Sequence, residues 1–264
     1  MDRVEARMRI VNLFSGSAGN CTFVRRGDAS ILIDAGGSAR SVLRSIERIG
    51  EDCGQIRAIF VTHEHSDHIS ALRTLLKKIS VPVFVPSGCA DRVAAAVDVM
   101  ADRIEPIAEG GTLRLCDFSV TPFRVPHDSD DCFGYRIGGG ERTLGVMTDA
   151  GMITDSVTNG LLGCTDALLE ANHDPDMVLC NTSYPQSLKD RILSGGGHLS
   201  NEACARLIAG LAPHGLRRVM LSHLSRENNT PDKAEKAVML ELSRNNVVGV
   251  SVCSASACTE TELF

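Results

Sequence analysis

The stretch from Ile56 to His68 places four potential metal ligands within six consecutive residues. A short apolar run, rich in β-branched and aromatic residues, leads into them and predicts a buried strand. The side chains suited to metal binding are His63, His65, Asp67 and His68. Imidazole and carboxylate groups are ligands of Zn, Mn and Fe, and two such ions side by side form a hydrolytic site.

The spacing within this cluster predicts two neighbouring ion sites. Side chains two apart in an extended segment point the same way, so we expect His63 and His65 to hold one cation. Asp67 and His68 come where the chain turns into a helix expected over residues 69–78, and they can face a second cation. Clustered histidines can also be incidental, or an expression tag, but the strand and the spacing favour a metal site.

This motif resembles the signature of a known family. Thr62 to His68 is similar to the His-x-His-x-Asp-His signature of the metallo-β-lactamase fold. The resemblance implies an α/β fold, a four-layer αββα sandwich in which two mixed sheets lie face to face with helices outside. It also implies a dinuclear metal site at one edge. A second stretch, Ser-Gly-Ser-Ala-Gly-Asn-Cys at residues 15–21, resembles the YycJ (WalJ)-type branch of this family.

Composition fits a globular protein of this size. The chain has 264 residues, of which 43% are apolar and 23% are charged, enough for a sizeable core. Its formal net charge of −6 argues against a generally basic nucleic-acid binder, although bound divalent cations would reverse the sign locally. No apolar run reaches the roughly 18 residues that span a membrane. The first residues carry acids and do not form a signal peptide.

Ten cysteines are scattered singly along the chain. Most lie in apolar runs, and we expect them to be small buried hydrophobic residues in a reducing compartment: Cys21, Cys53, Cys116, Cys180 and Cys253. We therefore expect a cytoplasmic protein. The sequence shows no linker or repeat and predicts one domain over residues 8–264. Because members of the resembled branch usually start near Met8, residues 1–7 are interpreted as an N-terminal extension.

Hydrophobic periodicity and turn residues predict the other elements. Helices are expected over residues 38–49, 91–100, 154–162, 185–193, 200–211 and 231–244. Strands are expected over residues 8–14, 21–24, 30–34, 81–85, 112–116, 118–125, 132–137, 142–148, 166–170, 217–222 and 247–253.

The resemblance implies three further ligands, each where a predicted strand ends. His127 corresponds to the family's third histidine, although a lone histidine there is more often a loop residue. Asp149 matches the bridging aspartate, and His223 resembles the final ligand histidine. Asp34 is expected to support a ligating histidine. The implied arrangement is two divalent transition-metal ions, Zn or Mn with Fe as a further candidate: one on His63, His65 and His127, the other on Asp67, His68 and His223, with Asp149 bridging them.

Catalytic residues are interpreted from the same resemblance. Asp67 can orient the attacking water. Glu170, at a strand end, and His198, in Gly-His-Leu-Ser, resemble the glutamate and histidine that serve tRNA-processing ribonuclease Z. His198 is therefore our candidate general acid, oriented and kept protonated by Glu170. Alternatively, His198 caps the following helix or binds a phosphate.

Two glycine-rich loops can be interpreted either as purely structural or as functional. Residues 15–20 form either a flexible hairpin turn or a backbone cradle for an anionic group, in which Ser17 and Asn20 would bind substrate. The glycines at 195–197 would permit unusual backbone angles and close approach to a substrate. Lys189 and Arg191 are interpreted as a solvated helix face.

Three classes of function remain open. The first is a metal-dependent phosphodiesterase, with DNA as its nucleic-acid partner and the 5′-to-3′ exonuclease activity that the resemblance implies. The second is a small-molecule hydrolase, either a thiolester hydrolase of glyoxalase type or a cyclic phosphodiesterase. The third is a metal-binding regulator without turnover. The His198–Glu170 pair favours phosphoryl chemistry, because a thiolate leaving group needs little protonation.

Overall fold

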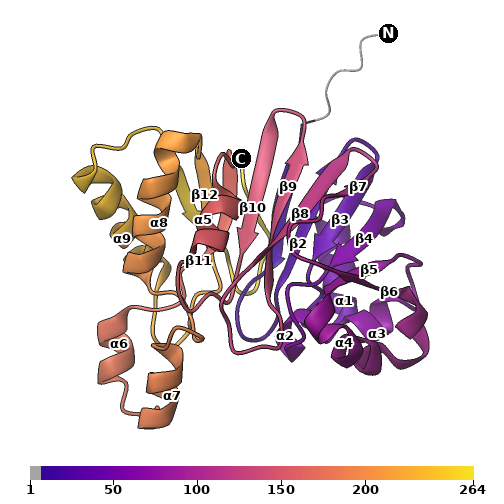
Figure 1. Ribbon diagram of the computed structural model, residues 1–264, viewed down its shortest axis with the longest axis horizontal. Helices are drawn as coiled ribbons and strands as arrows, with labels where there is room; N and C mark the ends of the chain where they lie inside the picture. The colour runs from indigo at the N-terminus through magenta and orange to yellow at the C-terminus, as the bar shows by residue number, and fades with distance from the viewer. Residues whose placement is uncertain (1–6) are drawn as a thin grey trace.

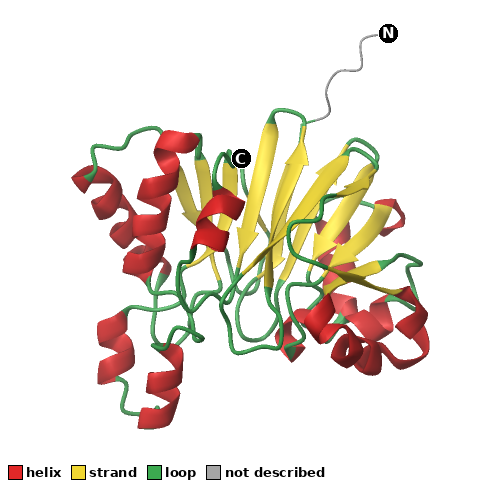
Figure 2. Cartoon of the chain, viewed as in Figure 1, coloured by secondary structure: helices red, strands yellow, loops and turns green. Residues whose placement is uncertain are grey.

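Two sheets packed face to face form the centre of the molecule, and helices cover their outer faces (Figures 1 and 2). The computed structural model describes residues 7–264, apart from the side chains of residues 99 and 100. The predicted extension, residues 1–7, lies outside the described residues except for Arg7. The architecture confirms the expected αββα sandwich.

The first sheet contains antiparallel and parallel strands. In spatial order it consists of β14 (Thr261–Glu262), β1 (Arg9–Phe14), β2 (Cys21–Arg26), β3 (Ala29–Ile33), β4 (Ile56–Phe60), β5 (Val83–Pro86) and β6 (Ile104–Ile107). β14 to β3 pair antiparallel, and β3 to β6 pair parallel. The sequence-distant strands β1 and β14 pair through Asn12 and Thr261.

The second sheet mirrors this arrangement. In spatial order it consists of β13 (Ser251–Ser254), β12 (Arg218–Ser222), β11 (Asp166–Glu170), β10 (Arg142–Met147), β9 (Phe133–Gly139), β8 (Phe118–Arg124) and β7 (Leu113–Leu115). β7 to β10 pair antiparallel, and β10 to β13 pair parallel. In both sheets, the carboxyl ends of the parallel strands therefore meet at a common edge.

Helices form the outer layers. α1 (Ala39–Arg48), α3 (Leu72–Leu75) and α4 (Ala90–Val97) pack on the first sheet; α5 (Asp155–Leu161), α8 (Asn201–Leu211) and α9 (Pro231–Arg244) pack on the second. α2 (Ser66–Ile69) follows β4, and Figure 1 shows α6 (Pro175–Cys180) and α7 (Gln186–Ile192) projecting below the second sheet. Short 3₁₀ helices are η1 (Cys53–Gln55), η2 (Ser87–Cys89), η3 (Asp98–Arg103) and η4 (Ala212–His214).

Three apolar clusters correspond to the spaces between these layers. One joins the first sheet to its helices, another joins the second sheet to its helices, and the third lies between the sheets. Phe60 and Tyr135 meet edge to face in the central cluster, with ring centroids 5.5 Å apart. Burial of side chains on both faces of each sheet explains why their strands read as continuous apolar runs.

Several predicted boundaries were wrong for identifiable reasons. The helix expected over residues 69–78 is two short helices, α2 and α3, because the backbone N–H of Ala71 donates to Ala35 at 2.9 Å. The helix expected over 91–100 stops at Val97, where Asp98 has φ 57°. The last strand of the second sheet begins at Ser251 and not at 247. β6, β14 and α6 were not predicted.

Cysteine burial agrees only partly with expectation. All ten cysteines are free thiols, and Cys21 is buried, but Cys116 and Cys180 are exposed. Cys116 has φ 50° just beyond β7, in the turn to β8, which carries it away from the core. Within the part of the chain that the structure describes, no helix combines the length and apolar character needed to cross a bilayer.

Candidate metal and catalytic site

The candidate site lies at the edge where parallel strands of both sheets end. His63 and Asp149 follow β4 and β10, Glu170 is the last residue of β11, and His223 follows β12. His127 comes from the loop after β8, so both sheets contribute side chains. Side chains from five separate segments meet here because each segment leaves its sheet at the same edge.

Three of the polar residues at strand exits have a backbone conformation that is costly for residues other than glycine. Asp34, Asp149 and His223 have φ values of 61°, 55° and 54°. The surrounding chain holds two of them in place: the N–H of Asp34 donates to Phe60 O at 2.8 Å, and that of His223 donates to Ser15 Oγ at 2.7 Å. Backbone strain of this kind is typical of functional sites, where it directs a side chain toward its task.

The first cluster consists of His63, His65 and His127, whose ligand atoms lie within 4.8 Å of one another. His65 Nδ1 and His127 Nε2 are 3.3 Å apart. The other nitrogen of His127, Nδ1, lies 3.2 Å from Gly197 O and donates to it. His127 therefore presents Nε2, with its lone pair, to its neighbours in this cluster.

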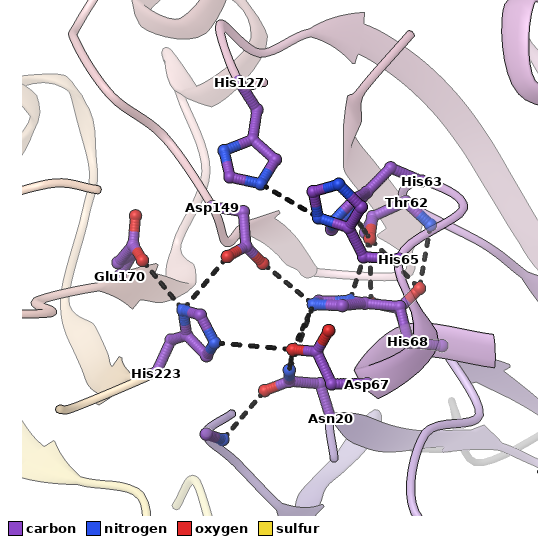
Figure 3. Close-up of polar contacts among 12 residues, drawn as sticks. Asn20, Thr62, His63, His65, Asp67, His68, His127, Asp149, Glu170 and His223 are labelled. Carbon is purple, nitrogen blue, oxygen red and sulfur yellow. Dashed lines mark hydrogen bonds and ion pairs between the residues drawn. The ribbon is translucent and has the colours of Figure 1, made fainter. Parts of the chain in front are cut away.

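The second cluster consists of Asp67, His68 and His223, which also lie within 4.8 Å of one another (Figure 3). His68 Nδ1 donates to Asp34 at 2.8 Å, and His223 Nδ1 donates to Glu170 at 2.8 Å. These carboxylates fix the ring orientations and leave Nε2 of each imidazole as the possible metal-binding atom. The contact expected of Asp34 is thus present.

Thr62 connects the two clusters. Its hydroxyl donates to Asp34 and accepts from His63 Nδ1 at 3.0 Å. This leaves His63 Nε2 as an acceptor, and that atom is buried without a hydrogen-bond partner among the described residues. His63 therefore presents a nitrogen lone pair in the same way as His68.

Asp149 lies between the clusters. Its Oδ2 is 2.9 Å from His68 Nε2, in a geometry that makes no hydrogen bond, and its Oδ1 is 3.2 Å from His223 Nδ1. Asp149 also forms, with His63 and His68, a group of side chains that could hold one metal ion. A carboxylate in this position can contact a cation in either cluster.

The donor set fits divalent cations. Three buried atoms of this ligand set have no hydrogen-bond partner in the described part of the chain: His63 Nε2, Asp149 Oδ2 and His223 Nε2. Leaving such groups unpaired costs free energy, which a bound ion would recover. Imidazole nitrogens together with carboxylate oxygens are the ligands preferred by Zn, Mn and Fe.

The clusters differ in protonation when no metal is bound. Burial, followed by the nearby charge of His68, holds the pKa of His63 well below its usual range. Burial also tends to lower the pKa of His68, but Asp34 and Asp149 outweigh it and the pKa is raised. The pKa of His223 is raised to about 9, because Asp149, Asp67 and Glu170 outweigh the effect of burial.

The buried Glu170 and the half-buried His198 form an acid–imidazole pair beside the second cluster. His198 Nδ1 donates to Glu170 Oε1 at 2.8 Å, while Glu170 Oε2 accepts from the N–H groups of Ala150 and Leu199. Burial opposes charge on His198, but Glu170 and Asp149 raise the pKa of its imidazole to about 11. The imidazole thus retains a proton at neutral pH.

The loop of residues 15–20 supports the second cluster through Asn20. Asn20 is buried, and its Nδ2 lies 3.1 Å from Asp67 Oδ2 and 3.0 Å from His68 Nε2 (Figure 3). Its Oδ1 accepts from the Gly16 N–H at 2.9 Å. Ser17, in contrast, is exposed on the same loop. The loop is thus more than a flexible hairpin.

Of the three glycines before His198, Gly197 serves backbone packing. None of Gly195, Gly196 and Gly197 has a positive φ, contrary to the expected unusual angles. A Cβ on Gly197 would lie 2.2 Å from Arg191 O, so this position requires glycine for close contact within the chain.

Arg191, interpreted from sequence as part of a solvated face, is exposed, and it also pairs with Asp128 at 2.5 Å, next to His127.

Sequence reasoning missed Asn172 and Ser15, which hold the His223 segment. Asn172 Nδ2 donates to His223 O at 2.8 Å, and its N–H donates to Leu199 O at 2.8 Å. It thereby connects the segments that carry His223 and His198. Asn172 could have been predicted from its position directly after β11, within Glu-Ala-Asn-His-Asp. Polar residues at strand exits gather at this edge.

Comparison with known proteins agrees with this geometry. The Beta-lactamase superfamily domain matches residues 29–224. Exodeoxyribonuclease YycJ of Bacillus anthracis is 31% identical over 227 residues, which cover 86% of each chain. Exodeoxyribonuclease WalJ of Streptococcus pneumoniae serotype 2 is 30% identical over 259 residues, which cover 95% of each chain. Among solved structures, the metallo-β-lactamase fold protein YhfI from Bacillus subtilis superposes with a TM-score of 0.72 at 18% identity, covering 98% of this chain and 100% of that chain.

Proposed function

The chain belongs to the β-lactamase superfamily, and on that premise we propose that it is a dinuclear-metal-dependent phosphodiesterase that hydrolyses DNA from the 5′ end. Support comes from two relatives that are named exodeoxyribonucleases and match most of the chain. The observation that carries the chemistry is the His198–Glu170 pair beside the metal clusters.

Two divalent ions, Zn or Mn with Fe as a further candidate, would occupy the clusters. His63, His65 and His127 would hold one ion, and Asp67, His68 and His223 the other, with Asp149 bridging. When bound, such a pair of cations activates water and stabilises the negative charge that develops on a phosphoryl group.

Asp67 would orient the attacking water by accepting a hydrogen bond from it. The Asp67 side chain is partly exposed, and the amide of Asn20 holds its Oδ2 in place. We therefore assign Asn20 to positioning Asp67 and not to direct substrate contact. Ser17, exposed at the loop surface, remains our candidate for contact with the substrate.

His198 would protonate the departing oxygen. Phosphodiester cleavage releases an alkoxide, which needs a proton, whereas a thiolate does not. The bond between His198 Nδ1 and Glu170 leaves Nε2 to donate, and Glu170 holds the proton on the ring.

The His198→Ala variant tests this assignment. We expect it to keep both metals and its substrate affinity while the chemical rate falls by roughly 10²–10⁴-fold on DNA. The loss should be much smaller on bis(p-nitrophenyl) phosphate, since p-nitrophenolate leaves without a proton. Equal losses on both substrates would contradict the acid role, and loss of one metal would make His198 a ligand.

Turnover of S-lactoylglutathione by the wild type, in preference to either phosphodiester, would instead favour a thiolester hydrolase.

We also infer that the protein works in a reducing compartment such as the cytoplasm, because none of its ten cysteines is paired.

A further inference from the structure

A groove of about 670 Å³ begins at the catalytic site and follows α8 away from it. Gly151 and His198 line its inner end, and His214 lines the end beyond α8. Figure 1 shows α5 and α8 side by side on the outer face of the second sheet, with α7 below them. The volume lies within the range typical of small-molecule sites.

Two stripes of α8 and its flanks form the long wall of this groove. Residues at 199, 203, 207 and 211 recur every four positions and give an apolar stripe. Arg206, Gly210 and His214 recur in the same way and give a second stripe, which is open to solvent. Residues four apart share one face of a helix, so the two stripes run in parallel along the groove.

The rim of the groove is apolar, although it is exposed. Met152, Leu162 and Leu193 line it with exposed fractions of 50%, 40% and 40%. Three large exposed apolar side chains around one depression indicate a surface that binds a partly apolar ligand. A nucleobase has such character.

Charge in the groove is suited to an anion. No lining residue in the described part of the chain is an aspartate or glutamate, although the chain carries 33 acidic residues. Arg206 is exposed and forms no ion pair or hydrogen bond with any described residue. Arg206 lies six residues beyond Ser200, about 9 Å along the helix axis, and helical side chains lean toward the N-terminus. Its Cα–Cβ bond therefore tilts toward the end of the helix at which His198 lies.

His173 provides a second polar group that points to a ligand. It lines the groove, is 2% exposed, and its Nδ1 has no hydrogen-bond partner among the described residues. Burial lowers the pKa of its imidazole, so the ring is neutral. A neutral, unpaired imidazole can exchange a hydrogen bond with a sugar or base.

We propose that this groove binds the terminal nucleotide that hydrolysis releases, with the base against the apolar rim and the 5′-phosphate on Arg206. The proposal rests on the proposed function and names the place of the leaving group. His198, at the inner end, would give its proton to the 3′ oxygen of that nucleotide.

The reaction balances with the nucleotide in this position. The water oxygen forms a bond to phosphorus, and the bond between phosphorus and the 3′ oxygen breaks. The released nucleotide gains a 3′ hydroxyl, and the remaining strand gains a 5′-phosphate. Every turnover therefore creates the 5′-phosphate that Arg206 would bind in the next one, whereas a strand that begins with a 5′ hydroxyl lacks it for the first turnover only.

Gly210 allows the groove to be blocked without damage to the fold. A Cβ at Gly210 would meet no atom within 4 Å, and both alanine and methionine favour helices more than glycine does. Gly210→Met should therefore fold and fill the groove, and Gly210→Ala is its matched control. Arg206→Gln removes the positive charge of the groove. Its control is Arg114→Gln, which changes an exposed arginine on β7 and gives the protein the same net charge.

The experiment uses metal-loaded protein and two measurements. Calorimetry with deoxythymidine 5′-monophosphate should show about 10–100-fold weaker binding for Arg206→Gln and Gly210→Met than for their controls. Release of the first nucleotide should be faster from a 5′-phosphorylated single-stranded oligonucleotide than from its 5′-hydroxyl form, and Arg206→Gln should abolish that preference. Hydrolysis of bis(p-nitrophenyl) phosphate should not change in the control variant Arg114→Gln.

Unchanged nucleotide binding in both groove variants would overturn the proposal, as would an intact 5′-phosphate preference in Arg206→Gln. Failure of the proposed function looks different: the wild-type protein would release no nucleotide from any oligonucleotide. In that case nucleotide binding to the wild type and to the groove variants still decides whether this groove is a nucleotide site.

Discussion

Strands β10, β11 and β12 carry buried charged groups at both ends. Only where the strands begin are the hydrogen bonds of these groups all made. Where the strands begin, Asp166 is fully buried between Arg142 and Arg218. Its Oδ1 lies 2.5 Å from Arg142 Nη2 and 2.5 Å from Arg218 Nε. Its Oδ2 accepts from both arginines and from Thr165 Oγ1 at 2.7 Å.

Where the same strands end, the charged groups are equally buried, but single atoms of them lack a hydrogen bond. Asp149 Oδ2 and His223 Nε2 have no hydrogen-bond partner in the described part of the chain, and both residues have positive φ. Unpaired buried groups and backbone strain each cost on the order of 1–3 kcal/mol. This end therefore lowers the stability of the metal-free fold.

The difference separates stabilising charges from functional ones. Permanent arginine charges satisfy the carboxylate at the beginning of the strands, so nothing remains there for a ligand. Imidazoles and strained carboxylates at the other end leave lone pairs for cations. A site selected for activity keeps such unsatisfied groups at the expense of stability.

Asp149→Asn should have the largest effect on activity. The amide is isosteric and tolerates the left-handed backbone, but it removes the negative charge between the two clusters. We expect turnover to fall by about 10³-fold or more, together with loss of bound metal. Elemental analysis and initial rates measure both. Full metal content with wild-type turnover would show that the charge of Asp149, where the strands end, is not needed for activity.

Asp166→Asn is the matched change at the other end. Breaking this buried ion group should lower the free energy of unfolding by about 3–5 kcal/mol, because two arginines lose their partner. Turnover per folded molecule should not change. Urea unfolding and active-site titration test the two parts, and a variant that remained stable but lost turnover would disprove the assignment of this end to stability alone.

Asp34→Asn should have an intermediate effect, confined to metal affinity. Asp34 holds His68 Nδ1 and increases the basicity of that imidazole. We expect one of the two ions to bind about 10–100-fold more weakly in chelator competition. Asp166→Asn serves as the control and should bind both ions as the wild type does. Equal affinity in both variants would show that this carboxylate does not tune the ligand.

The smallest effect should be on the pH dependence of the free energy of unfolding of the metal-free protein. Its sign should be opposite for His223, where the strands end, and for Asp166, where they begin. His223 has its pKa raised to about 9, so its stabilisation is complete below about 6.5 and is lost as pH rises through 9. Two arginines oppose the effect of burial and lower the pKa of Asp166, so its stabilisation is lost as pH falls through that depressed pKa.

Urea unfolding at a series of pH values, with chelator present, measures each contribution. His223→Ala should reduce the alkaline loss only, and Asp166→Asn the acid loss only. Identical pH profiles in all three proteins would refute this separation.

Local pattern was sufficient to predict the first half of the site. His63, His65, Asp67 and His68 are adjacent in the sequence, and a strand before them determines where they point. His127, Asp149 and His223 lie in separate strand exits and were found only through resemblance, because no local rule brings such distant residues together.

Contacts that depend on tertiary packing were not predictable in this way. Ala71 pairs with Ala35 and interrupts the expected helix, and Asn172 reaches the His223 segment across neighbouring strands. The groove was equally unpredictable, since α5, α6 and α8 contribute to it from distant parts of the chain. Residue spacing within one helix or strand carries no information about contacts between distant elements.

The pairing of β1 with β14 affects how the nascent chain acquires activity. β1 emerges from the ribosome well before its partner β14, which follows about 250 residues later. At roughly 5–20 residues per second, that interval is on the order of tens of seconds. His223, which Ser15 anchors from the end of β1, is also synthesised late. A partly translated chain can therefore display the histidine motif well before His223 is present to complete the candidate site.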